Sequence, residues 1–116
     1  MAQKANGGAE NAGDEQALII SMKLSDDGSG KPEELERMFK LEEELREAIS
    51  GGGSGEYDGN EIGGGIFKLY IYGPGAARLW EVASPIVKKF GAPAGSFAVI
   101  RYGKPGAKED RVSLPE

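Results

Sequence analysis

The sequence predicts an α+β protein in which an antiparallel sheet carries two helices on one face. Three observations lead to this prediction. Two apolar runs, ALIISMKL and IFKLYIY, alternate with the two-residue period of half-buried strands. Two longer segments repeat apolar residues at helical spacing. Turn-forming residues separate these segments, since the 116 residues include 19 glycines and 6 prolines.

The N-terminal segment and the first strand differ sharply in composition. Residues 1–16 hold almost nothing to bury, so we expect a disordered N-terminal tail. From Ala17 the alternation places Leu18, Ile20 and Met22 on one side of a strand that we expect to lie in the middle of the sheet. A chain of this length has room for one modest core, and we therefore expect a single domain over residues 17–116.

The first helix is expected from about Pro32 to about Ile49. Proline suits the first helical position, and three glycines after Ser50 end the helix. The acidic side chains are predicted to face water and to pair four residues apart, as Glu42 does with Arg46.

The second half predicts three further strands and one helix. GEYDGNEIGGG is typical of a short, irregular edge strand or the bulged arm of a hairpin, and IFKLYIY of a regular strand. A second helix is expected over about Ala76 to Phe90, with Pro85 kinking or dividing it. FAVIRYG is expected to form the last strand, and GKPGAKEDRVSLPE a polar tail with a short extended RVSL segment.

The resulting order, β-α-β-β-α-β, is that of a ferredoxin-like sandwich when the crossovers are right-handed and both helices lie on one face. The first and third strands are central in that topology, and here they are the most apolar strands.

This topology leaves one sheet face open, and we predict that it binds a protein partner or a second copy. Lys68, Tyr70 and Tyr72 decorate it from the third strand, and Ile19, Ser21 and Lys23 from the first. The facing of the last strand, with Phe97, Val99 and Arg101, stays open at this stage. The alternative interpretation is that tyrosine is simply a good strand former on a half-wet sheet.

A second hypothesis is a small-molecule-binding protein or enzyme with a carboxylate and amide site near the glycine-rich strand. Its residues would be Asp58, Asn60, Glu61 and Arg101. Paired carboxylates need a low-dielectric pocket for acid/base catalysis, and no segment of the sequence predicts one. Because the chain lacks His and Cys, imidazole and thiolate chemistry are excluded, and we predict no catalytic residue, metal ligand or cofactor.

Charge and hydropathy bear on the remaining classes of partner. A net charge of −5 without a basic block disfavours duplex nucleic acid, and GGIFKLYIY matches an RNA-recognition motif poorly. Residues 25–36 fit a calcium loop only in part, because its first position is Ser25, and a solvated turn is expected instead. No apolar run is long enough to cross a bilayer and no secretory signal is evident, so we expect a cytoplasmic protein.

Four segments carry a resemblance: PEELERMFKLEEEL, DGNEIGGG, YGPGAARLW and RYGKPG. With them the chain resembles small stand-alone bacterial proteins of uncharacterised function. More remotely, its acidic ferredoxin-like pattern is similar to that of the RraB-type inhibitors of ribonuclease E. This resemblance implies a protein that inhibits or regulates by binding another protein, and it transfers no individual binding residue.

Overall fold

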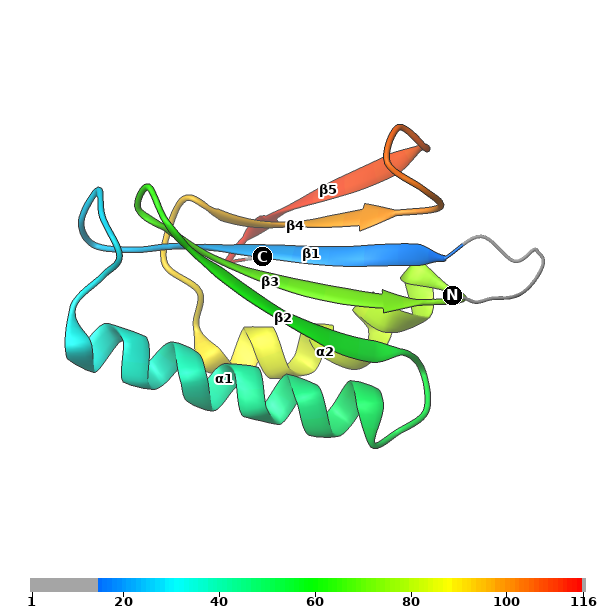
Figure 1. Cartoon of the computed structure of the whole chain (residues 1–116), viewed down its shortest axis with the longest axis horizontal. Helices are drawn as coiled ribbons and strands as arrows, with labels where there is room; N and C mark the ends of the chain where they lie inside the picture. Colours follow the sequence, from blue (N-terminus) through cyan, green and yellow to red (C-terminus); the bar gives the residue numbers. More distant parts are fainter. Residues whose placement is uncertain (1–14, 116) are drawn as a thin grey trace.

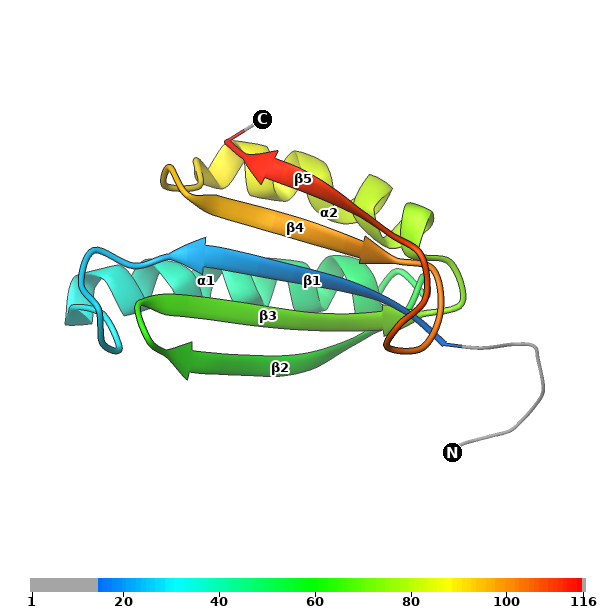
Figure 2. The same ribbon diagram turned by 90° about the horizontal axis from the view of Figure 1, so that it is seen from above.

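The computed structural model describes residues 15–115, which form a five-stranded antiparallel sheet and two helices (Figure 1). The strand order is β2-β3-β1-β4-β5, so β1 lies in the middle. Both helices pack on the same face of the sheet, and no element of the described chain covers the other face (Figures 1 and 2). The strands are β1 (Gln16–Lys23), β2 (Glu56–Gly63), β3 (Ile66–Gly73), β4 (Ser96–Arg101) and β5 (Glu109–Leu114), and the helices are α1 (Pro32–Ser50) and α2 (Ala76–Phe90).

The α+β class and the antiparallel sheet with two helices are confirmed, but the expected number of strands is wrong. The predicted polar tail contains β5, which pairs with β4 from Ser96↔Leu114 to Arg101↔Glu109. Leu114 is only 4% exposed and belongs to the core. The extended RVSL segment is therefore part of a strand at the edge of the sheet.

The core lies between the sheet and the helices. Its centre is a set of cross-strand pairs between β1 and β3, in which Leu18 opposes Ile71 and Ile20 opposes Leu69. These side chains are fully buried. Burying a side chain of this size contributes about 1.5–3 kcal/mol. The helices contribute further buried side chains: Met38, Leu41, Leu45 and Ile49 from α1, and Leu79, Ala83 and Val87 from α2.

Of the two effects expected of Pro85, a kink or a division of the second helix, the division is wrong. The helix α2 runs continuously over the predicted range with Pro85 inside it. Pro85 is exposed, and so is Glu81, whose carbonyl would have accepted the missing hydrogen bond. Water can donate a hydrogen bond to that carbonyl, so the hydrogen bond that Pro85 cannot donate costs less on this exposed side of the helix than it would on the buried side.

The strand β2 is the irregular edge strand that the sequence predicts. Its pairing with β3 shifts between Tyr57 and Gly59, where Asp58 forms a bulge. The hairpin to β3 turns at Gly64 and Gly65, whose φ angles of 60° and 81° both lie in the left-handed region. Such a two-residue turn matches the twist of the strands it joins.

The boundaries at the start of the chain differ slightly from expectation. Of the predicted tail, residues 1–14 lie outside the described range. Gln16 is the first residue of β1, and its Oε1 accepts a hydrogen bond of 2.7 Å from the backbone N–H of Ala76 at the start of α2. Neither helix within residues 15–115 combines the length and the apolar character needed to span a membrane.

Replacement of Leu114 by alanine tests whether β5 is an integral strand. We expect L114A to lower the free energy of unfolding by about 2 kcal/mol or more, because it removes buried methyl groups and leaves a cavity. Ser113→Ala is the matched control, since Ser113 lies next to Leu114 and is exposed. Urea unfolding measures both, and equal stability of the two variants would show that β5 does not close the core.

Candidate functional site

The strand register arranges the uncovered sheet face into rows that cross the strands. We call this face the open face. Its rows, each written from β2 to β5, are the end row Glu56, Tyr72, Ala17, Arg101, Glu109; the central row Gly59, Tyr70, Ile19, Val99, Arg111; and the third row Glu61, Lys68, Ser21, Phe97, Ser113. Figure 2 looks down onto this face, with the helices behind it.

The register also decides the facing of β4. Phe97 lies opposite Ser21, Val99 opposite Ile19 and Arg101 opposite Ala17. The alternate residues of β4, Ser96, Ala98 and Ile100, are buried. Phe97, Val99 and Arg101 therefore belong to the open face, which settles the alternative that the sequence left open.

The tyrosines of the open face are partly exposed rather than covered by a helix. Tyr70 and Tyr72 have intermediate exposure, as do Ile19 and Val99 beside them. The Tyr70 hydroxyl donates a 2.8 Å hydrogen bond to Oε1 of Glu61. Burial and this hydrogen bond raise the pKa of Tyr70 above its ordinary value. Tyr70 therefore keeps its proton at neutral pH and presents an apolar ring with an anchored hydroxyl.

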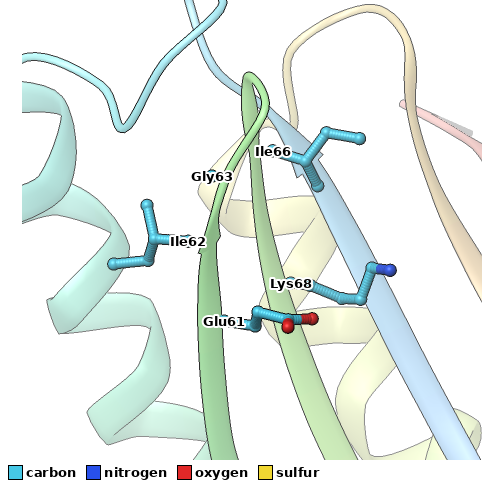
Figure 3. A pocket seen from close by; sticks show the side chains of 5 residues that line it. All are labelled: Glu61, Ile62, Gly63, Ile66 and Lys68. Carbon is cyan, nitrogen blue, oxygen red and sulfur yellow. The ribbon is translucent and has the colours of Figure 1, made fainter.

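The β2–β3 hairpin separates its side chains between the two faces. Figure 3 shows Glu61 and Lys68 on the same side of the hairpin, whereas Ile62 points towards α1. Glu61 and Lys68 are cross-strand neighbours in the third row. Together with Ile62, Gly63 and Ile66 they line a pocket at this end of the sheet (Figure 3).

Charge is distributed unevenly over the open face. Acidic side chains gather on β2, where Glu56, Asp58 and Glu61 form what we call the acidic edge. Their influence reaches β3, because burial raises the pKa of Tyr72 and the negative charge of Asp58 raises it further. The other strands carry the cations of this face, Lys23, Lys68, Arg101 and Arg111, and also the acid Glu109 on β5.

Two arginines of this set are held in defined places. The guanidinium carbon of Arg111 lies 3.7 Å from the centroid of the Phe97 ring, a cation–π contact between β5 and β4. The Nε–H of Arg101 donates a 2.9 Å hydrogen bond to the carbonyl of Gly103. The sequence analysis missed Arg111, because its segment was assigned to the polar tail; recognising RVSL as a strand would have placed it.

Three residues of the predicted carboxylate and amide site, Asp58, Asn60 and Glu61, line one open pocket with Tyr70 and Tyr72, but the polar groups of Asn60 and Glu61 are bonded on opposite faces. Glu61 lies on the open face, but the amide Nδ2–H of Asn60 donates a 2.7 Å hydrogen bond to Oε2 of Glu42 on α1. The two residues are consecutive in β2, and successive side chains of a strand point to opposite faces. Asp58 lies in the bulge, and Arg101 lies three strands away on β4.

Glu42 is the centre of a polar cluster that the sequence analysis missed. The residue is only 7% exposed, and its carboxylate also accepts a 2.5 Å hydrogen bond from the hydroxyl of Tyr57. Burial, followed by this hydrogen bond, raises the pKa of Tyr57 far above its ordinary value. The expected pairing of Glu42 with Arg46 is wrong, since Arg46 instead forms an ion pair with Glu43 at 2.7 Å and lies over the Tyr57 ring. Because Glu42 lies under β2, tertiary contacts replace the local pairing.

Within residues 15–115, no group of three or more His, Cys, Asp or Glu side chains is placed to hold a metal ion. The segment resembling a calcium loop forms a turn in which Oδ1 of Asp26 accepts hydrogen bonds from the backbone N–H groups of Gly28 and Gly30. No family model matches the chain, and comparisons with curated proteins and with solved structures found no match either.

Removal of the Tyr57 hydroxyl tests the buried cluster. We expect Tyr57→Phe to lower the free energy of unfolding by about 1–3 kcal/mol, because a buried carboxylate loses one of its donors. Tyr70→Phe removes the same atom from an exposed hydrogen bond to a carboxylate, and we expect a change within about 0.5 kcal/mol. Equal losses in urea unfolding would contradict the role of Glu42.

The stability of the unmodified chain and that of the Tyr57→Phe variant should depend differently on pH. A raised folded-state pKa means that Tyr57 stabilises the fold fully below its ordinary pKa of 10.0 and less as the pH rises above it. The stability advantage of the unmodified chain over Y57F should therefore shrink at alkaline pH. Urea unfolding at about pH 8, 10 and 11 measures this trend, and a constant difference would contradict it.

Proposed function

We propose that this protein is a non-enzymatic binding or regulatory module that acts by protein–protein contact through the open face. The observation that carries the proposal is the central row, in which Tyr70, Ile19 and Val99 lie side by side on a face that no described element covers. Tyrosine supplies large contact area at low entropic cost and is enriched in interfaces. The flanking Tyr72 and Phe97 extend this apolar centre.

We also propose a ferredoxin-like fold for the part of the chain from β1 to β4. These six elements follow the order β-α-β-β-α-β with sheet order β2-β3-β1-β4, and β5 extends the β4 edge. The resemblance to RraB-type inhibitors of ribonuclease E, stated from the sequence, is in line with regulation by contact with another protein. A cytoplasmic location stays a prediction from the sequence.

The alternative functions receive less support from the geometry. A carboxylate and amide site would need Asn60, but its amide group is bonded to Glu42 on the helix side. A nucleic-acid surface would need the backbone phosphates to pass the acidic edge of Glu56, Asp58 and Glu61. Contact with a protein requires neither a free Asn60 amide nor the passage of phosphates over the acidic edge.

Site-specific photocrosslinking tests the proposed function. A photoreactive phenylalanine analogue placed at Tyr72 probes the open face, and the same analogue at exposed Glu44 on α1 serves as the control. We expect cross-linking of a defined protein, identified by mass spectrometry, from position 72 and not from position 44. The additional substitution Tyr70→Ala should reduce the yield, because it removes apolar area from the contact. Equal yields from the two positions would count against the open face.

A further inference from the structure

The open face is charged in a way that matches a rotated copy of itself. The acidic edge on β2 lies at one side of the sheet, and Arg101 and Arg111 lie at the other side on β4 and β5, beside a single carboxylate, Glu109. Between them, Tyr70, Ile19 and Val99 form an apolar centre with Ile19 in the middle. A surface with opposite charges on its two sides and an apolar middle is self-complementary under a suitable two-fold rotation.

We propose that the occupant of the open face is a second copy of this chain, related by a two-fold axis that runs parallel to β1 between the two sheets. This inference rests on the proposed function and names its partner. Rotation about such an axis keeps each row in place and exchanges its ends. The β2 strand of each copy then faces β5 of the other, and the two β1 strands meet at the axis.

The central row shows what this arrangement brings together. Ile19 meets Ile19 of the second copy, and Tyr70 meets Val99 of the second copy. Gly59 lies opposite Arg111, and nothing lies within 4 Å of the position that a Cβ at Gly59 would take. Arg111 of one copy can therefore pass over Gly59 and reach Glu61, which follows two residues later on the same face of β2. Because Tyr70 holds only Oε1 of Glu61, the second carboxylate oxygen can accept from the guanidinium.

The perpendicular two-fold axis gives a poorer match. It would place β2 over β2 and β5 over β5, so the acidic edges would face each other. In the favoured arrangement the like-charge approaches are Glu56 with Glu109, Lys23 with Lys23, and Glu15 with Glu15 of the second copy. All of these side chains are exposed and lie at or beside the ends of their strands. Solvent screens such pairs.

The size of the face fits a reversible dimer. Three strands of 8 residues and two of 6 residues, spaced about 4.8 Å apart with a rise of about 3.3 Å per residue, give a flat area of about 400 Å² on each copy, measured between the axes of the edge strands. Two copies therefore bury about 800 Å² before the relief of the side chains is counted, which is below the roughly 1,200–2,000 Å² of stable specific interfaces and in the range of weak, transient contacts. The association should therefore depend on protein concentration and be sensitive to single charges at the interface.

Charge reversal at Glu61 or at Arg111, the two residues predicted to pair across the interface, tests the proposal. Glu61→Arg and Arg111→Glu each place two like-charge pairs in the dimer, and each should raise its dissociation constant about tenfold or more in analytical ultracentrifugation. An equimolar mixture of the two variants should restore dimers, because every pair is again of opposite sign. The double variant E61R/R111E should also dimerise. Both residues are exposed, and circular dichroism checks that the fold is retained.

The outcomes separate this inference from the proposed function. A chain that stays monomeric up to about 1 mM overturns the second copy as occupant. If the probe at Tyr72 then captures a different protein, the proposed function stands; if it captures nothing, both fail. A dimer that survives each single reversal, or a mixture that fails to restore it, overturns the two-fold arrangement. Cross-links from position 72 to a second copy, together with restoration by the mixture, support it.

Discussion

The position of β1 between β3 and β4 is the constraint on which the rest of the structure depends. Hydrogen bonded on both sides, β1 can direct its side chains only above or below the sheet. Leu18, Ile20 and Met22 enter the core, and the residues between them lie on the open face. A shift of one residue in this register would exchange the two sets, exposing apolar side chains and burying Lys23. The same register aligns Tyr70 and Val99 with Ile19, so the candidate site and the core have one common cause.

The hydrogen bonds of Glu42 explain how an irregular edge strand keeps its place. The bulge at Asp58 weakens the pairing of β2, but Tyr57 and Asn60 both donate to the Glu42 carboxylate on α1. A buried carboxylate without such donors would be costly, so helix and strand hold each other in one register. With these two side chains engaged on the helix side, Glu56 and Glu61 are left on the open face. The acidic edge is thus a consequence of how β2 is attached.

Local periodicity carried enough information for most elements, and contacts distant in sequence account for what it missed. The helix α2 was predicted with its observed bounds, and β3 nearly so, because their apolar residues repeat regularly. In β5 Val112 and Leu114 are the apolar residues, a pattern too short to distinguish a strand from a polar tail. The pairing of Glu42 with Arg46 follows from helix spacing alone, whereas Tyr57 reaches Glu42 from another element. Similarly, the facing of Phe97 is decided by its pairing with Ser21.

Net charge is a poor guide to the charge of one face. The chain carries −5, but α1, which holds many of the acids, lies on the opposite side of the sheet from the open face. The open face itself combines an acidic edge with four cations, so its field changes sign across the strands. A polyanion would find attraction at Arg101 and Arg111 and repulsion at the acidic edge. A second copy related by the proposed two-fold axis would place its arginines over the acidic edge and its own acidic edge over the arginines of the first copy. Both charged sides of the open face would then meet opposite charge.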